Sequence, residues 1–227
     1  MNVWDNTYPY CFPVGESALL LEFAEEMTPT ANARVRAVDL RMQEFPLEGV
    51  IEWIPAYASL LIKYDPIRMT SSDVQQWLGL CLESASVNAQ GETRCVHIPV
   101  RYGGDDGPDL ETVAAFHGLL PSEVVARHTR VKYKVGMMGF TPGFAYLMGL
   151  DPSLVTPRRD TPRVIVPAGS VGIAGSQTGI YPLDSPGGWQ LIGRTDQALF
   201  IPDQDPPFLL SPGDDVQFIV VGDGAVS

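Results

Sequence analysis

The sequence is short of cysteine and of long apolar runs. Its 227 residues contain only three cysteines, and their odd number and their spacing, which forms no CxxC pair, argue against a disulfide framework. No apolar run approaches the ~18 residues of a membrane-spanning helix, and the N-terminus lacks the basic and apolar regions of a signal peptide. We therefore expect a cytoplasmic protein that does not cross a membrane.

Positive charge is also scarce. Fifteen lysines and arginines stand against 27 aspartates and glutamates, the formal net charge is −12, and no basic cluster exceeds the pair Arg158-Arg159. Nucleic-acid-binding proteins carry a basic patch or stripe, and an acidic surface does not favour anionic membranes. The composition therefore argues against nucleic acid and membranes as partners, and the negative charge is typical of a protein kept soluble by its surface.

Several signatures of catalysis are missing as well. The sequence contains no GxxxxGK[ST] phosphate loop and no GxSxG nucleophile elbow. Its three histidines, His97, His117 and His128, lack the HExxH spacing and match no zinc-site pattern. We expect no metal site, and the residue pattern assigns no catalytic residue.

The chain nevertheless has enough apolar residues for a sizeable core, since 45% of them are hydrophobic. Residues 1–91 predict an N-terminal α/β domain. Its expected elements are the strands Ala18–Phe23, Val50–Ala56 and Ser59–Tyr64, a helix that begins at Thr28 and Pro29, and a second helix capped by Ser71 or Ser72. The order ββαββαβ, with Thr93–Tyr102 as a strand that leaves the domain, predicts a ferredoxin-like α/β sandwich.

Residues 92–227 predict a second domain of a different kind. Two short helices, Asp109–Phe116 and Pro121–Arg130, precede a stretch of short apolar runs separated by glycine and proline. The expected strands are Lys132–Met138, Arg163–Val166, Val171–Ala174, Gly179–Leu183, Gln190–Gly193, Ala198–Ile201 and Asp215–Val221. Many short strands joined by such turns predict a closed or nearly closed β-barrel. The fold class is therefore α+β.

The segment from Gly139 to Thr195 carries the residues most suited to chemistry. Its dense glycines are typical of tight turns or of main chain that approaches a ligand closely. Neutral hydrogen-bonding groups lie between them, and guanidinium groups suit a carboxylate or phosphate. A site for a small acid amide needs this mixture, so the candidate substrate-binding residues are Arg158, Arg159, Gln177, Thr178 and Tyr181.

A structural role is the alternative for each part of this segment. Arg158 and Arg159 can instead pair with Asp151 or Asp160 on the surface, where such a pair contributes little. The aromatic residues Phe140, Phe144 and Trp189 are core residues by default, and the glycines can serve barrel corners. Asp184, Asp196 and Asp214 are the carboxylates near these loops, and their spacing suggests no catalytic pair.

Four ordered strings in this segment resemble one known family. They are GFTPGFAYL, TPRRDTPR, VPAGSVGIAGSQTGIYP and PGGWQLIGRT, and looser matches include VGESALLLEF, IPVRYGG and GPDL. Together they resemble the family of the 5-oxoprolinase B subunit, which is also described as allophanate hydrolase subunit 1 and includes the Kip inhibitor of a sporulation kinase. The resemblance extends over nearly the whole chain.

This resemblance implies an N-terminal α/β domain followed by a cyclophilin-like β-barrel domain. It also implies an ATP-dependent 5-oxoprolinase complex that cleaves 5-oxo-L-proline, a small-molecule amide, to L-glutamate. The implied partners are a protein like the 5-oxoprolinase C subunit (allophanate hydrolase subunit 2), with a similar barrel, and a third protein, the A subunit. ATP is then used by the complex and is not bound by this chain alone. Because isolated strand edges are a liability unless covered, we expect residues 92–227 to form the main contact with the C subunit.

Two other functions are compatible with the sequence. The chain can be a regulatory binding protein that inhibits a sensor histidine kinase, as the Kip inhibitor does. A peptidyl-prolyl isomerase is suggested by analogy with the barrel alone, but the cyclophilin catalytic motif is not recognisable, and a shared fold is weak support for a shared function.

Overall fold

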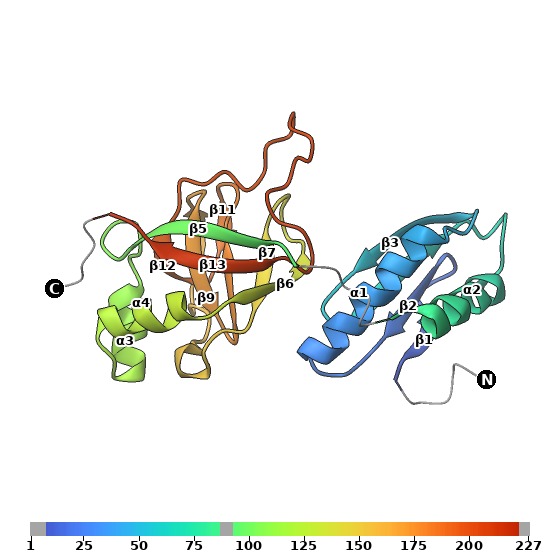
Figure 1. Cartoon of the computed structure of the whole chain (residues 1–227), viewed down its shortest axis with the longest axis horizontal. Helices are drawn as coiled ribbons and strands as arrows, with labels where there is room; N and C mark the ends of the chain where they lie inside the picture. Colours follow the sequence, from blue (N-terminus) through green and yellow to red (C-terminus); the bar gives the residue numbers. More distant parts are fainter. Residues whose placement is uncertain (1–7, 87–92, 223–227) are drawn as a thin grey trace. The chain divides into compact units, whose positions relative to one another are not determined.

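The computed structural model of the chain describes residues 8–86 and 93–222. Contacts between residues divide the chain into two compact units, Met1–Glu92 and Thr93–Ser227, each of which is described by itself (Figure 1). That the two units are independent domains stays a prediction. Among the helices of the described ranges, none is both long enough and apolar enough to cross a bilayer.

The N-terminal unit is a four-stranded antiparallel sheet with two helices. Its elements are β1 (Tyr10–Pro13), β2 (Ala18–Glu22), α1 (Pro29–Glu44), β3 (Val50–Pro55), β4 (Ser59–Tyr64) and α2 (Ser71–Ser84). The sheet order is β1-β2-β4-β3. Leu19 and Leu21 of β2, Val38 of α1 and Leu78 of α2 are buried in one cluster, so both helices cover the same face of the sheet.

The predicted order of elements is confirmed up to its last strand, which joins the barrel as β5, but the name ferredoxin-like does not fit this order. A ferredoxin-like domain has the order βαββαβ, whereas this unit begins with a hairpin of two strands and has the order ββαββα. Gly15 turns the chain between β1 and β2 with a φ of 70°, a conformation that glycine adopts without steric cost. The layers of a split α/β sandwich are retained, because two helices still cover one sheet.

Local sequence explains where the two helices begin. Thr28 caps α1, since its side chain accepts a hydrogen bond from the N–H of Ala31, and Pro29 follows at the first helical position, as the sequence predicts. The cap of α2 is Thr70, not Ser71 or Ser72. Thr70 has extended backbone angles and forms a capping box with Asp73, whereas Ser71 is already helical.

The C-terminal unit contains the β-barrel that the sequence predicts. Its elements are β5 (Cys95–Tyr102), α3 (Leu110–His117), α4 (Pro121–Arg130), β6 (Tyr133–Met138), β7 (Ala145–Met148), the 3-10 helix η2 (Pro152–Leu154), β8 (Arg163–Val166), β9 (Ser170–Ala174), β10 (Gln177–Ile180), β11 (Ser185–Gly187), β12 (Gln190–Arg194) and β13 (Asp215–Val220). Seven strands close the barrel in the order β10-β7-β6-β13-β5-β12-β9, while β8 and β11 form a separate pair.

Closure of the barrel weakens the argument made from strand edges. The seven barrel strands have no free edge, and among residues 93–222 only the separate pair of β8 and β11 has edges that a partner can cover. The interior is filled with apolar side chains such as Ile98, Val135, Leu147 and Phe218, all of them buried. The barrel is therefore a packed core and not a pore.

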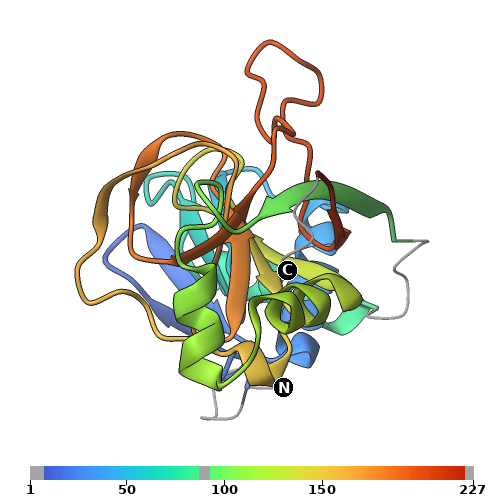
Figure 2. The same cartoon turned by 90° about the vertical axis from the view of Figure 1, so that its left-hand side faces the viewer.

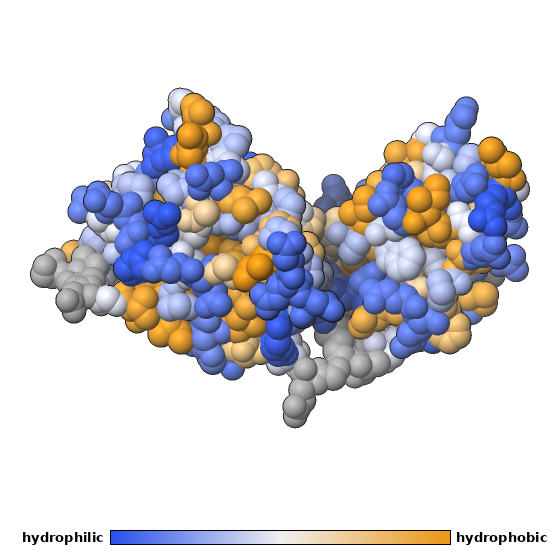
Figure 3. Space-filling view, turned by 90° about the horizontal axis from the view of Figure 1, so that it is seen from above, coloured by the Kyte–Doolittle hydropathy of each residue, from blue (hydrophilic) through white to orange (hydrophobic). Residues whose placement is uncertain are grey.

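The predicted strand Ala198–Ile201 is instead the start of a projecting loop, which stands away from the barrel in Figures 1 and 2. The rings of Phe200 and Phe208 stack at its base with their centroids 5.1 Å apart. Pro202, Pro206 and Pro207 lack the N–H group that a strand ladder needs, which explains why the pairing stops there. On the face shown in Figure 3, hydrophobic residues are interspersed with hydrophilic ones.

Candidate functional site

The outer face of the barrel carries a second apolar cluster, built on glycine. Trp189 lies across the strands β9 and β10 at the positions of Gly172 and Gly179. A Cβ atom added to Gly179 would lie 3.1 Å from Cζ3 of Trp189, and one added to Gly172 would lie 3.1 Å from its Cβ. These two glycines therefore admit the indole ring against the sheet, and packing alone explains them.

Tyr181 extends this cluster. It is buried, its ring packs edge-on against Phe144 at 5.2 Å, and a Cβ on Gly187 would lie 2.4 Å from its hydroxyl oxygen. Burial raises the pKa of Tyr181 to about 12, although the N–H of Trp189 and the charge of Arg158 oppose the shift. The phenol is therefore neutral at pH 7.

Phe140, in the GFTPG string, has an unusual backbone conformation. Its φ is 68°, a costly value for a bulky side chain, and its side chain is 59% exposed. The ring lies edge-on to Phe144 and Tyr181. Beside it is a pocket of about 520 Å³, lined by Met138, Gly139, Phe140, Thr141, Pro142, Gly143, Phe208, Leu210, Ser211 and Pro212. Strain and exposure at one aromatic residue are typical of a functional position.

Arg158 lies over this aromatic cluster. Its guanidinium carbon is 6.0 Å from the centroid of the Trp189 ring, and its charge acts on the hydroxyl groups of Tyr146 and Tyr181. The side chain is exposed, and within residues 8–86 and 93–222 no carboxylate pairs with it. Arg158 is thus a cation beside an aromatic wall that an anionic ligand can reach.

Arg159 has a different role from the one predicted. Its Nη1 lies 3.0 Å from Oδ1 of Asp109, and Nη2 of Arg163 lies 2.8 Å from the same oxygen. Asp151, the partner that the surface-pair alternative allowed, binds Arg130 instead. Arg159 is therefore anchored to Asp109, and its part in substrate binding stays a prediction.

The segment that carries Arg158 is held at several further points. The hydroxyl of Thr156 interacts with Nε2 of His117 at 3.0 Å, and its carbonyl accepts the N–H of Gly175 at 2.7 Å. Gln190 donates to the carbonyl of Pro157, and the N–H of Arg159 donates to that of Gly188. The main chain on both sides of Arg158 is thereby fixed, while its side chain has no carboxylate partner in residues 8–86 and 93–222.

Thr178 lies inside the barrel and not at this site. It is fully buried, and its hydroxyl donates to the carbonyl of Gly172. It must then accept the Nε2 proton of His128, at 2.9 Å, so Nδ1 of His128 accepts from the hydroxyl of Tyr102 at 2.8 Å. Burial lowers the pKa of His128 to about 3, which keeps the imidazole neutral in this chain of hydrogen bonds. We assign Thr178 a structural role.

Gln177 is half-buried at the start of β10, on the same face of the strand as Gly179. Trp189 packs over Gly179, so Gln177 belongs to the strand face on which that indole lies. Tyr146 pairs with Gly179 across β7 and β10. Of the five predicted residues, the structure therefore brings Arg158 and Tyr181 to one aromatic cluster, with Gln177 on the same strand face. Arg159 and Thr178 serve the scaffold.

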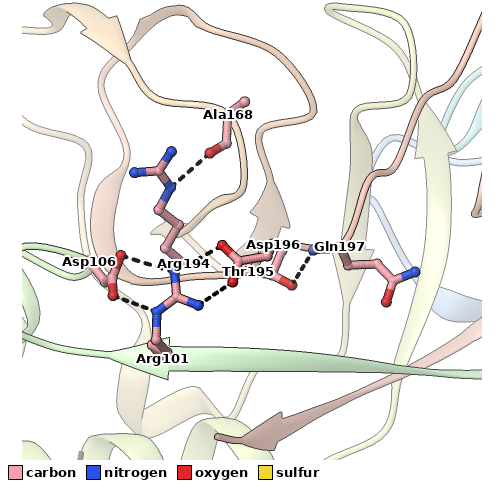
Figure 4. Close-up of polar contacts among 7 residues, drawn as sticks. All are labelled: Arg101, Asp106, Ala168, Arg194, Thr195, Asp196 and Gln197. Atoms are coloured by element: carbon pink, nitrogen blue, oxygen red, sulfur yellow. Dashed lines mark hydrogen bonds and ion pairs between the residues drawn. The ribbon is translucent and has the colours of Figure 1, made fainter. Parts of the chain in front are cut away.

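The carboxylates near these loops are each engaged elsewhere. Asp196 and Asp106 both bind Arg101 at one end of the barrel, and Figure 4 shows this arginine between the two. Arg101 lowers the pKa of Asp196 through their hydrogen bonds. Asp184 accepts the N–H of Ala168, and Asp214 binds Arg94. In the part of the chain that the structure describes, no group of three or more His, Cys, Asp or Glu side chains could hold a metal ion.

Two residues of the site were missed by reasoning from the sequence. Tyr146 was overlooked because its strand, β7, was not predicted, although the GFTPGFAYL string contains it. Asp109 was treated as the start of a helix. The one sequence feature that could have singled out Asp109 is the string GPDL, which is part of the family resemblance.

Comparisons with known proteins agree with this architecture. Residues 9–210 match the family described as "Carboxyltransferase domain, subdomain C and D". The chain is 44% identical to the 5-oxoprolinase B subunit of Bacillus subtilis (strain 168), with 92% of each chain covered. It is 43% identical to the 5-oxoprolinase B subunit of Escherichia coli O157:H7, with 94% of this chain and 97% of that protein covered.

The chain is also similar in fold to solved structures. The crystal structure of TTHA0988 matches with a TM-score of 0.80 and 40% identity over 90% of this chain, which spans 40% of that longer chain. The urea amidolyase of K. lactis matches with a TM-score of 0.74 at 21% identity over 93% of this chain and 15% of that one, which shows the fold alone. From the family match and the identity to the curated relatives, the chain belongs to the family of the 5-oxoprolinase B subunit, within the carboxyltransferase subdomain C and D proteins.

Proposed function

We propose that this chain is one component of an ATP-dependent 5-oxoprolinase complex that cleaves 5-oxo-L-proline to L-glutamate and that is inactive without its partners. The relatives named as the B subunit of 5-oxoprolinase support this proposal over most of the chain. The observation in the structure that supports it best is Arg158, an exposed guanidinium beside Trp189 with no carboxylate partner among the described residues.

The chemistry of 5-oxoproline suits this arrangement. Its carboxylate can pair with the fork of the Arg158 guanidinium, and its ring can lie against the aromatic side chains beside it. The neutral hydroxyl of Tyr181 supplies a donor near the same arginine, since the pKa of that phenol is about 12. These groups bind and orient a small acid amide, but they include no nucleophile, so the bond-breaking groups belong to another protein of the complex.

Neither of two pockets formed by the described residues offers an unpaired cationic side chain to a triphosphate. The pocket of about 520 Å³ beside Phe140 is lined without any cationic side chain. The pocket of about 750 Å³ between α1 and α2 has one, Arg41, which is already bound to Glu44 and Ser84. A triphosphate needs free cations or a glycine-rich cradle, so we propose that ATP is bound by a partner protein.

The partners proposed are a protein like the 5-oxoprolinase C subunit and a third protein, the A subunit. The naming of the relatives as one lettered component of 5-oxoprolinase supports an enzyme built from several chains. TTHA0988 supports a second polypeptide region beside this fold, because the present chain spans only 40% of it.

The test is reconstitution of the complex with each component omitted in turn. We expect ATP-dependent release of glutamate from 5-oxoproline only when this chain and its partners are together, and no turnover by this chain alone. Arg158→Ala should lower the activity of the assembled complex by more than about tenfold, the loss of one charge-assisted pair.

Arg34→Ala is the matched control, because Arg34 also lies over an aromatic ring, that of Phe23, in the N-terminal unit. It should leave turnover unchanged. Robust turnover by the isolated chain would contradict the proposed dependence on partners. A complete complex that releases no glutamate would contradict the proposed activity, and binding to a sensor histidine kinase would then favour the regulatory alternative.

A further inference from the structure

Asp109 occupies the N-cap position of α3 but does not cap the helix. Aspartate at this position normally accepts a hydrogen bond from an N–H of the first helical turn. Asp109 makes no such bond, and its side chain is only 4% exposed. A buried carboxylate that leaves its own helix uncapped must be held by other partners.

Those partners all belong to the walls of the candidate site. Oδ2 of Asp109 accepts the N–H of Leu191, at 2.7 Å, two residues after Trp189. Oδ1 accepts from Nη1 of Arg159 at 3.0 Å and from Nη2 of Arg163 at 2.8 Å. The Asp109 carboxylate thus connects β12, the strand after Trp189, with two arginines of the segment that carries Arg158.

The charges at this point do not cancel. Two guanidinium groups share a single carboxylate, and Nε of Arg159 and Nη1 of Arg163 are buried without a hydrogen-bond partner among the described residues. The local excess of one positive charge favours an anion nearby and disfavours collapse of Arg158 onto Asp109. The side chain of Arg158, which precedes Arg159 in the sequence, is therefore not drawn to Asp109.

We infer that Asp109 is a positioning residue, which holds Arg159 and Arg163 so that Arg158 stays over Trp189 ready for the substrate carboxylate. This inference rests on the proposed function. Asp109 touches no substrate. It fixes the main chain on one side of Arg158 through Arg159, and it fixes the β12 strand beside Trp189 through Leu191. The Asp109 carboxylate thereby holds the Arg158 segment and the strand beside Trp189 in a fixed position relative to each other.

The test is a double-mutant cycle in the assembled complex. Asp109→Asn keeps an acceptor for the N–H of Leu191 but removes the charge that holds the arginines. We expect KM for 5-oxoproline to rise about tenfold with a smaller change in kcat, because a misplaced Arg158 binds the carboxylate less well. In the Arg158→Ala background, Asp109→Asn should cause no further rise in KM.

A second variant covers the case in which Asp109→Asn fails to fold. Arg163→Lys keeps a positive charge near Asp109 but replaces the guanidinium Nη2 that binds Oδ1 by an ammonium on a different stem. This variant should likewise raise KM only when Arg158 is present. Asp214→Asn is the matched control, since Asp214 is also a buried carboxylate that binds an arginine, Arg94, and a backbone N–H, that of Ser211. It should leave KM unchanged.

The outcomes separate the two proposals. If Arg158→Ala lowers activity but Asp109→Asn and Arg163→Lys raise KM equally with or without Arg158, the positioning role is wrong and the proposed site stands. If Arg158→Ala has no effect on a working complex, the site itself is wrong. A rise in KM for Asp214→Asn equal to that for Asp109→Asn would assign the effect to general destabilisation, and would also overturn the inference.

Discussion

Arg158 lies over the ring of Trp189 with its guanidinium carbon 6.0 Å from the ring centroid, while its neighbour Arg159 is bound to Asp109. Adjacent arginines thus have opposite environments. One is exposed and unpaired among the described residues, and the other is half-buried and anchored. A dipeptide that looks uniform in sequence therefore separates into a residue suited to binding and a residue suited to structure.

Alanine at these two positions should separate activity from stability. Arg159→Ala should lower the free energy of unfolding by about 1.5–3 kcal/mol, because it removes a charge-assisted bond to a buried carboxylate. Arg158→Ala should change it by roughly 0.5 kcal/mol or less, since 6.0 Å is at the limit of a cation–π contact. Denaturant unfolding of both variants measures the difference. Equal losses in stability would contradict the separate roles.

The glycines of the SPGG string give a second pair of variants. A Cβ on Gly187 would lie 2.4 Å from the hydroxyl oxygen of Tyr181, so Gly187→Ala must displace that ring, at a cost of about 1–3 kcal/mol. A Cβ on Gly188 has no atom nearer than 3.6 Å. Gly188→Ala is the matched control and should leave the thermal midpoint unchanged or slightly higher. A similar loss for both variants would mean that Tyr181 is not packed as described.

Much of the fold was available from the sequence because its signals are local. Thr28 and Pro29 mark the start of α1, and apolar spacing predicts α2 and the barrel strands other than β7. Strand pairing is not a local property. The order ββαββα was predicted, but β1 was not among the strands located in the sequence, and its pairing with β2 comes only from the structure. The strand β11 was missed because Ser185–Gly187 contains proline and glycine, and only its pairing with β8 makes it a strand.

The candidate site stays a prediction, but the structure shows where each of its predicted residues lies. Sequence alone identifies arginines and polar residues in a glycine-rich segment, but burial decides what each of them does. Thr178 faces the barrel interior because β10 alternates between two faces, and Arg159 is bound to Asp109, 50 residues away in sequence. Such long-range partners leave no mark in composition or spacing.

Neutral His128 predicts a loss of stability in mild acid. A histidine in an unfolded chain binds a proton near pH 6.5, whereas burial lowers the pKa of His128 in the folded protein to about 3. Between these values the unfolded state binds one more proton, so the free energy of unfolding falls as the pH decreases. From pH 6.5 to pH 5 we expect the free energy of unfolding to fall by roughly 2 kcal/mol, as measured by denaturant unfolding.

The control for this prediction is His128→Gln, which keeps a donor and an acceptor but does not titrate. Between pH 6.5 and pH 5 its free energy of unfolding should change less with pH than that of the unmodified protein, because its unfolding binds about one proton fewer. His117→Gln is a second control, because His117 lies at the end of α3 and is not fully buried. The same slope for His128→Gln and the unmodified protein would contradict a buried neutral imidazole.

The last prediction concerns the partner protein. The barrel unit exposes Phe140 in a strained conformation, next to a pocket that Phe208 also lines, and Ile201 is exposed on the projecting loop. Exposed apolar side chains beside a pocket favour a protein contact. We therefore expect residues 92–227, more than residues 1–91, to bind a protein like the 5-oxoprolinase C subunit and to bury at least about 1,600 Å² in total.

Two truncated proteins, one ending near Gln90 and one starting near Gly91, test this when each is co-expressed with the partner. Circular dichroism first establishes that each piece is folded, since a failure to bind means nothing for an unfolded piece. Phe140→Ala in the full chain should weaken capture of the partner by tenfold or more if the ring is a central contact. Ile67→Ala is the matched control, because Ile67 is even more exposed but lies in the N-terminal unit. If the N-terminal piece captures the partner and a folded C-terminal piece does not, the barrel is not the main contact.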